Sequence, residues 1–262
     1  MILPQHINKI TMVGAGNVAW HLAKGLSLKG YKIVQVWSRT IESASELAQR
    51  VNAEPAEDLD SLTPETDLFI ISVSDSAITD VVSQFNHSGS LIVHTSGSVS
   101  MNELAGRSNS FGVFYPLQTF SKYIPVNLAE VPFCIEASGN KELGLIREVA
   151  QSLSSNVHEI NSEDRLLLHL SAVFASNYSN FMYMLASDIL DSRGLSFDLL
   201  KPLVAETAHK VITSAPSRVQ TGPAKRGDLN TIDKHIKLLA SMPEYAEIYR
   251  LLADKIRQRF HS

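Results

Sequence analysis

A short strand that runs through a glycine-containing turn into a helix restricts the fold of this chain more than any other feature. Residues 9–13 read Lys-Ile-Thr-Met-Val, and the pattern Gly-x-Gly-x-x-Ala follows at Gly14, Gly16 and Ala19, before a helical pattern over 18–28. In such a unit the first glycine makes the tight turn, the second lets backbone approach a pyrophosphate, and the small third residue permits close helix–strand packing. The segment predicts a dinucleotide-binding unit that opens a doubly wound α/β domain.

The glycines alone are weak evidence for a nucleotide, because a tight strand-to-helix turn requires glycine whether or not a ligand binds. A second predicted strand at 33–37 strengthens the interpretation. Sites selective for NAD carry Asp or Glu at the end of that strand. This chain has Ser38, Arg39 and Thr40 there, and a guanidinium attracts the 2′-phosphate that a carboxylate would repel. NADP is the predicted cofactor, with a solvated Arg39 of no function as the alternative.

The chain divides by pattern into two domains. Strand-like runs alternate with helical stretches over residues 1–160, as in a parallel sheet covered by helices, and the run 68–73 is apolar almost throughout, as in a strand buried on both faces. Beyond residue 160 only helical spacing remains. The predicted fold class is α/β, with a Rossmann-type, mostly parallel sheet in 1–160 and an all-helical domain in 161–262. The strands are expected at 10–13, 33–37, 68–73, 91–95, 112–115, 133–137 and 157–160.

The helical domain is expected to begin with one long helix over residues 162–192, with Ser162 as its N-cap. A later helix is expected to start at the N-cap Asp228. The long helix carries a stripe made of Leu166, Leu170, Val173, Asn177, Phe181 and Met184. At about 45 Å it would exceed the width of a domain of about 100 residues, so a second subunit is expected to cover part of it. The apolar stretch 166–175 is expected to be a buried helix, and a homodimer through the helical domain is predicted.

Composition excludes several classes of function. The formal charge is −4, with no charged block at either end, so no nucleic-acid partner is expected. Cys134 is the only cysteine, which excludes an internal disulfide and a thiolate-rich metal site, and no metal is predicted. The first nine residues lack the features of a signal peptide, and no run approaches the roughly 20 apolar residues of a membrane span. A cytoplasmic protein without a membrane partner is therefore predicted.

Seven segments together resemble one superfamily. The segments 14–19, 38–40 and 72–78 resemble 6-phosphogluconate and β-hydroxyacid dehydrogenases, pyrroline-5-carboxylate reductases and deazaflavin-dependent NADP oxidoreductases. The segments 94–98, 115–120, 175–178 and 221–228 are similar to a little-characterised branch of NADP oxidoreductases. The resemblance spans essentially the whole chain and implies a Rossmann domain, a helical dimerisation domain and a substrate cleft between them. It implies cofactor contacts from Gly14, Ala15, Gly16, Asn17, Val18, Ser38, Arg39, Thr40, Val73 and Ser74.

The remaining site candidates are polar residues near the expected carboxyl edge of the sheet and on the helical domain. The predicted catalytic residues are His94, Ser96 and Asn177. The predicted contacts of a small substrate are Gln118, Asn177 and Arg226. The positive charge of Arg226 would suit an anionic substrate. Each has a structural alternative: a backbone-bonded strand end for His94, an ordinary turn for Ser96, an interhelical hydrogen bond for Asn177 and a solvated charge for Arg226.

One departure from the resemblance concerns proton transfer. The β-hydroxyacid dehydrogenases carry a lysine four residues before an asparagine on their first interdomain helix, and if Asn177 is that asparagine, Val173 occupies the lysine position. Oxidation of a 3-hydroxy acid is therefore not carried over, because alkoxide formation needs a general acid or base beside the oxygen. The predicted function is an NADP-dependent oxidoreductase that transfers hydride between the nicotinamide and a small substrate bound between the domains. An imine (pyrroline-carboxylate-like) or deazaflavin reductase, a non-catalytic NADP-sensing dimer and a partner-binding module without nucleotide affinity stay open.

Overall fold

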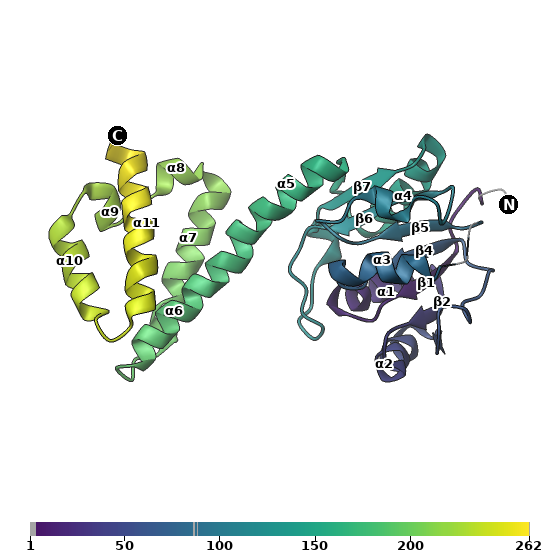
Figure 1. Ribbon diagram of the computed structural model, residues 1–262, viewed down its shortest axis with the longest axis horizontal. Helices are drawn as coiled ribbons and strands as arrows, with labels where there is room; N and C mark the ends of the chain where they lie inside the picture. Colours follow the sequence, from purple (N-terminus) through teal and green to yellow (C-terminus); the bar gives the residue numbers. More distant parts are fainter. Residues whose placement is uncertain (1–3, 86, 88, 262) are drawn as a thin grey trace. The chain divides into compact units, whose positions relative to one another are not determined.

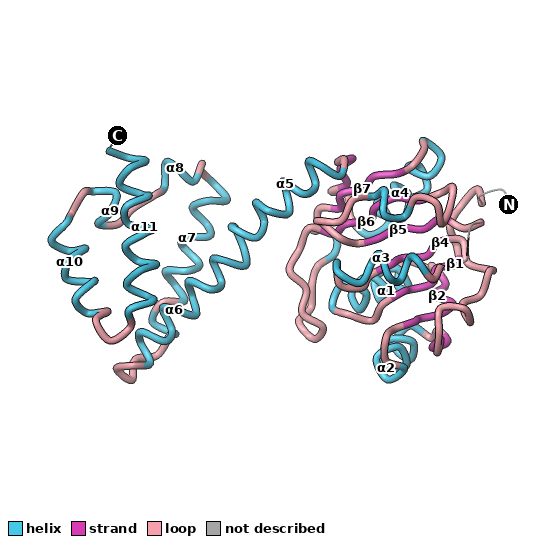
Figure 2. The backbone as a smooth tube through the Cα atoms, viewed as in Figure 1, coloured by secondary structure: helices cyan, strands magenta, loops and turns pink. Residues whose placement is uncertain are grey.

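The computed structural model describes residues 4–85, 87 and 89–261 and consists of two compact units, Met1–Asn177 and Tyr178–Ser262. The first three residues, part of the segment expected to lack a signal peptide, lie outside the described residues. Strands occur in the first unit, and the described part of the second is built from helices and loops (Figure 2). The strands end at Glu159, close to the domain boundary predicted after residue 160. The helix that follows this point belongs to the first compact unit, and the predicted domain boundary itself stays a prediction.

An eight-stranded sheet forms the centre of the first unit, in the order β3-β2-β1-β4-β5-β6-β7-β8 (Figure 1). The strands are β1 (Lys9–Val13), β2 (Lys32–Trp37), β3 (Glu54–Ala56), β4 (Leu68–Ile71), β5 (Leu91–His94), β6 (Phe111–Pro116), β7 (Phe133–Ala137) and β8 (Val157–Glu159). Every neighbouring pair is parallel except β6 and β7. The Rossmann-type, mostly parallel sheet predicted from the sequence is therefore confirmed. The strand order changes direction between β1 and β4, which creates a switch point at the carboxyl edge.

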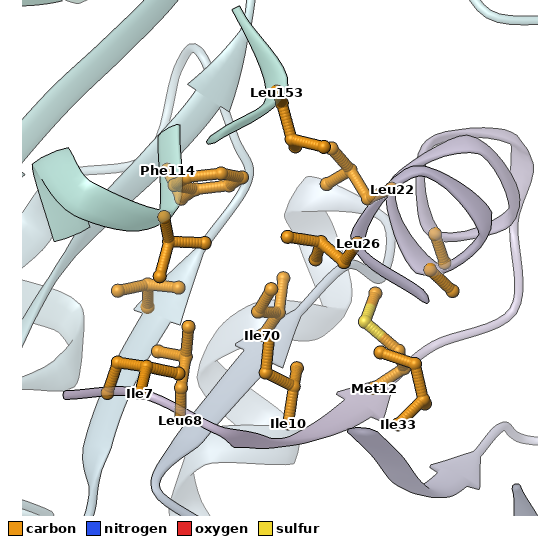
Figure 3. Packing of buried hydrophobic residues seen from close by; sticks show 14 of the residues in the cluster. Ile7, Ile10, Met12, Leu22, Leu26, Ile33, Leu68, Ile70, Phe114 and Leu153 are labelled. Carbon is orange, nitrogen blue, oxygen red and sulfur yellow. The ribbon is translucent and has the colours of Figure 1, made fainter. Parts of the chain in front are cut away.

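Helices cover both faces of the sheet. They are α1 (Asn17–Leu28), α2 (Ile41–Val51), η1 (Asp75–Ala77), α3 (Ile78–Ser83), η2 (Met101–Leu104), η3 (Leu128–Glu130) and α4 (Asn140–Leu153). Successive strand residues point to opposite faces: Ile10 and Met12 of β1 pack in a core with α1, α2 and α4 (Figure 3), whereas Val13 packs in a second core with α3. Both faces of the sheet are therefore covered by packed helices, and its carboxyl edge is the part that can form a site.

The long helix predicted over 162–192 is three consecutive segments, α5 (Ser162–Ala172), the π-helical η4 (Val173–Tyr178) and α6 (Ser179–Asp191). The N-cap is Asn161 and not Ser162, since the Asn161 Oδ1 accepts a hydrogen bond from the Asp164 amide at 2.8 Å. The expected burial of 166–175 is also wrong for the single chain. The side chains of Leu167 and Phe174 are 62% and 63% exposed.

The second unit continues with short and medium helices. They are η5 (Phe197–Leu199), α7 (Lys201–Thr213), α8 (Pro216–Val219), α9 (Pro223–Arg226), α10 (Leu229–Leu238) and α11 (Pro243–His261). Asp228 caps α10 as predicted, because its Oδ1 accepts from the Thr231 amide at 3.0 Å. The buried core is small and centres on Ala224, Ile232 and Ala253. Among the described residues, none of the helices combines the length and apolarity that crossing a membrane requires.

Candidate active site

A cavity of about 570 Å³ collects the segments that leave β1, β2, β4 and β5 at the carboxyl edge of the sheet, together with Tyr115 of β6. Doubly wound sheets bind ligands at such an edge, beside the switch point. The cavity is lined by all ten residues that the resemblance assigns to the cofactor, namely Gly14, Ala15, Gly16, Asn17, Val18, Ser38, Arg39, Thr40, Val73 and Ser74. Ser96, a predicted catalytic residue, lines it as well.

Gly14 and Gly16 serve different purposes in this cavity. Gly14 has φ +120°, and a Cβ there would lie 2.2 Å from the Ser72 carbonyl oxygen, so the fold itself requires glycine. A Cβ on Gly16 would meet nothing within 4 Å, so packing does not require that glycine. Gly16 is also the N-cap of α1 and provides no side-chain cap for its first amides. Open space above uncapped amides at a helix start fits a pyrophosphate.

Arg39 lies at the end of β2, exposed and on the cavity wall. No ion pair formed within the described part of the chain includes Arg39, so its charge is available to a ligand. Its neighbour Thr40 donates from Oγ1 to the Ser43 hydroxyl at 2.8 Å. The carboxylate on the cavity wall, that of Asp75, accepts a short 2.5 Å hydrogen bond from the Ser98 hydroxyl. A free guanidinium at this position fits a ribose 2′-phosphate.

Tyr115 and His169 line the same cavity, and the sequence did not assign either to the site. The Tyr115 hydroxyl lies 3.2 Å from His169 Nδ1. Burial raises the pKa of Tyr115 to about 12, so the phenol keeps its proton near neutral pH. A Cβ on Gly97 would lie 2.7 Å from Tyr115 Cζ and 2.8 Å from His169 Nδ1, so these groups meet where glycine leaves room. The sequence held two signals: His169 lies within the most apolar stretch of the chain, and Tyr115 begins the segment 115–120 that contributes to the resemblance.

His94 ends β5 and is completely buried, and it is not among the cavity-lining residues. Its Nδ1 accepts a hydrogen bond from the Ser96 amide at 3.2 Å, and its Nε2 has no hydrogen-bond partner within the described structure. Burial, followed by the positive charge of Arg165, lowers the pKa of His94 to about 4. Its ring is therefore neutral beneath the loop of Ser96. The catalytic roles predicted for His94 and Ser96 stay predictions.

Three other predicted site residues do not line this cavity. The Gln118 Oε1 accepts from the neighbouring Thr119 amide at 2.8 Å, so its amide group shapes its own loop. Asn177 is exposed within η4. Arg226 is exposed on α9 of the second unit. Their roles toward substrate stay predictions. Among the described residues, no group of His, Cys, Asp or Glu has the arrangement of a metal site.

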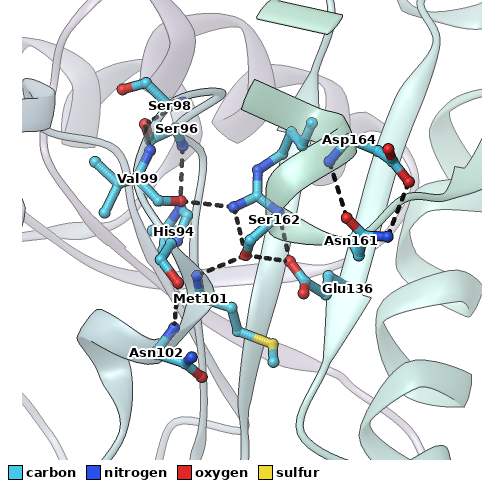
Figure 4. Close-up of polar contacts among 12 residues, drawn as sticks. His94, Ser96, Ser98, Val99, Met101, Asn102, Glu136, Asn161, Ser162 and Asp164 are labelled. Carbon is cyan, nitrogen blue, oxygen red and sulfur yellow. Dashed lines mark hydrogen bonds and ion pairs between the residues drawn. The ribbon is translucent and has the colours of Figure 1, made fainter. Parts of the chain in front are cut away.

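A buried ion pair holds the start of α5 against the sheet. The Arg165 guanidinium, in a residue only 1% exposed, donates to Glu136 Oε2 of β7 at 2.5 Å and to the Val99 carbonyl at 2.6 Å. The Ser162 hydroxyl donates to the same Glu136 oxygen at 2.8 Å and accepts from the Met101 amide (Figure 4). Because His169 follows Arg165 by one helical turn, this network fixes the part of α5 from which His169 reaches Tyr115.

The fold and this cavity define a Rossmann-type NAD(P)-dependent oxidoreductase. Residues 9–97 match the family described as NADP oxidoreductase, coenzyme F420-dependent, and residues 131–256 match the domain of unknown function DUF2520. A crystal structure from Bacteroides fragilis, described as an NADP oxidoreductase, is 44% identical over 96% of this chain and 98% of its own, with a TM-score of 0.90. The chain belongs to this family of NADP oxidoreductases, and NADP is its cofactor.

Two more distant structures share the fold. The reductive aminase from Aspergillus terreus in complex with NADPH4, cyclohexanone and allyl amine is 16% identical, with a TM-score of 0.72 over 96% of this chain and 93% of that one. The imine reductase from Myxococcus stipitatus in complex with NADP+ is 17% identical, with a TM-score of 0.66 over 97% and 93%. None of the curated proteins matches this chain.

Proposed function

We propose that this chain is an NADPH-dependent reductase of small imines. The observation that carries the proposal is a cavity in which the ten predicted cofactor residues meet Tyr115 and His169, and the described residues that line it include no lysine. The first amides of α1, after Gly16, would hold the pyrophosphate, and Arg39 with its neighbours would hold the 2′-phosphate. When NADPH is bound, its nicotinamide supplies a hydride, and the protein supplies position and a proton.

The chemistry of the lining favours a C=N bond over a hydroxy acid. The residues beside the phosphate segments are mostly hydroxyl-bearing, including Ser72, Thr95 and Ser96. If Asn177 is the asparagine of the resembling dehydrogenases, Val173 stands where they carry lysine. Reduction of an imine asks less of the protein than deprotonation of an alcohol, since the C=N bond is already polarised. The distant structures described as an imine reductase and a reductive aminase support the same substrate class.

Arg39 provides the test of the cofactor site. We expect NADPH to raise the melting temperature more than NADH at equal concentration, because ligand binding to the native state stabilises it by RT ln(1 + [L]/Kd). Arg39→Asp should weaken NADPH binding by at least about tenfold, which corresponds to about 1.4 kcal/mol. Arg107→Asp makes the same charge change at an exposed residue outside the cavity lining and should leave binding unchanged. Equal NADPH affinity in the two variants would contradict the assignment of Arg39.

The reaction class is tested by NADPH consumption with a cyclic imine, a 2-oxo acid and a deazaflavin. Consumption with the imine supports the proposal. Consumption with the deazaflavin alone would contradict the imine and would identify a deazaflavin, a second cofactor, as the hydride acceptor. Tight NADPH binding without turnover of any acceptor would favour the NADP-sensing dimer instead.

We also propose that the chain forms a homodimer through its helical part. The occupant of its exposed apolar helix faces would be a second copy, because the apolar faces occur in both units and the second unit has a small core of its own. These side chains include Leu166, Leu170, Phe181, Met184, Leu203 and Ile212. A cytoplasmic location, which suits the single buried thiol of Cys134, stays a prediction.

A further inference from the structure

Reduction of a neutral imine adds a hydride to carbon and a proton to nitrogen, so a site for this reaction must contain a proton donor. We propose that Tyr115 is this donor and that His169 positions its hydroxyl. This inference rests on the proposed function. If Asn177 is the asparagine of the resembling dehydrogenases, their proton-handling lysine is replaced by Val173, which carries no exchangeable side-chain proton.

Location selects Tyr115 among the groups with an exchangeable proton. Both Tyr115 and His169 line the cavity that contains the cofactor residues, at 3.2 Å from each other. His94 is buried outside the lining, and the Oδ2 of Asp75, the acid on the cavity wall, is occupied by a hydrogen bond from the Ser98 hydroxyl. Among the described residues of the lining, Tyr115 and His169 are therefore the pair in which a proton can be held and replaced.

The state of the phenol suits a donor. Burial raises the pKa of Tyr115 to about 12, and the titratable or charged groups that face it are the Cys134 thiol on β7, Asp75 on η1 and the Arg165 guanidinium on α5. The first two raise its pKa and Arg165 lowers it. The phenol is protonated before the reaction, and Arg165 lies near enough to favour the phenolate that remains afterwards.

His169 completes the proton balance. We assign the tautomer with a hydrogen on Nδ1, which donates to the Tyr115 oxygen and leaves the phenol hydrogen free for substrate. The phenol O–H bond breaks as the N–H bond of the product amine forms. The Nδ1 hydrogen then passes to the phenolate while Nε2 takes a proton from a water molecule, which leaves as hydroxide, and rotation of the ring or exchange with water restores the first tautomer. The overall reaction therefore consumes the imine, NADPH and one proton from the solvent.

A pair of substrates separates proton donation from every other role of Tyr115. Neutral methylpyrroline needs a proton on nitrogen, whereas its N-methylated iminium salt already carries the positive charge and needs the hydride alone. Measured at a pH where methylpyrroline is unprotonated, Tyr115→Phe should lower kcat/KM for the neutral imine by about 100-fold, the usual contribution of a general acid. The iminium salt should be reduced at nearly the wild-type rate. Tyr31→Phe, away from the cavity, should change neither value.

Variants of His169 test the positioning role. His169→Leu removes the hydrogen bond and should lower kcat/KM for the neutral imine selectively, whereas His169→Asn keeps a donor near the Nδ1 position and should restore part of it. A readout without turnover is the NMR signal of the His169 ring nitrogens in the free protein, assigned by its loss in His169→Asn. Tyr115→Phe should shift the Nδ1 signal, because its hydrogen-bond partner is lost.

Each result decides between separate failures. Wild-type protein that binds NADPH but reduces neither compound would overturn the proposed function. Wild-type activity that Tyr115→Phe leaves unchanged, or lowers equally for both compounds, would overturn the role of Tyr115 alone. Selective loss of the neutral imine in Asp75→Asn, with Tyr115→Phe unaffected, would make Asp75 the donor. An unchanged His169 Nδ1 signal in Tyr115→Phe would overturn the pairing.

Discussion

Gly14 and Gly16 are two residues apart, yet substitution by alanine should affect fold stability at Gly14 and cofactor binding at Gly16. Gly14→Ala should destabilise the fold by about 2 kcal/mol or more, because the new Cβ meets the Ser72 carbonyl and φ is +120°. Gly16→Ala should leave the melting temperature of the free protein unchanged and weaken NADPH binding, because its Cβ enters the open cradle. Thermal melts with and without NADPH measure both effects. A loss of free-protein stability in Gly16→Ala would contradict the open space that the structure shows around Gly16.

The common cavity of the residues predicted to hold the cofactor could be foreseen because the motif fixes their geometry locally. Gly14, Gly16 and Arg39 each follow a strand, and parallel strands bring such positions to one edge. Tyr115 and His169 escaped prediction because their contact joins residues 54 positions apart and depends on where α5 packs over β6. Gln118 failed to reach the cavity for a local reason that sequence does not display, the hydrogen bond to its own neighbour Thr119.

At the scale of elements, the buried ion pair between Arg165 and Glu136 joins the start of α5 to β7. Glu136→Leu should lower the free energy of unfolding by about 3 kcal/mol or more, because it leaves the buried Arg165 charge without its carboxylate. Adding Arg165→Met should recover much of the loss, since an apolar pair of similar volume avoids the buried charge. Urea denaturation measures both.

The ion pair of Arg147 with Glu159 supplies the control for that series. Both of its side chains are substantially exposed, so Glu159→Leu should cost less than about 1 kcal/mol. If the two leucine variants lost the same stability, the stabilising role assigned to the Glu136–Arg165 ion pair would be contradicted.

Element types were predictable from periodicity, whereas their ends and directions were not. The seven expected strands all form, but β3 is a three-residue edge strand containing Pro55, too short to leave a pattern. The antiparallel pairing of β6 with β7 is equally invisible, because apolar runs read the same in either direction. Asn161 and Ser162 are both good N-cap residues, and the contact of Ser162 with Glu136 gives the cap to Asn161.

The whole molecule should be a dimer of about twice the 28.8-kDa chain mass. Met184 is 54% exposed on α6, and Met184→Glu should shift the light-scattering mass toward that of one chain, because a charge would be buried against the second copy. Gln258→Glu adds the same charge at an exposed polar position of α11 and should leave the mass unchanged. A wild-type mass of one chain at micromolar concentration would contradict the proposed dimer.

The position of α5 bears on how this family can be recombined. A chain cut where the strands end, after residue 160, would retain the whole phosphate cradle but would be deprived of Arg165 and His169. A chimaera joined at that point would take its predicted cofactor residues from one parent and His169 from the other. Under the proposed mechanism, coenzyme preference and proton supply would then come from different parents. A chimaera that keeps Tyr115 and His169 from the same parent must instead include α5 with the sheet and be joined after α5.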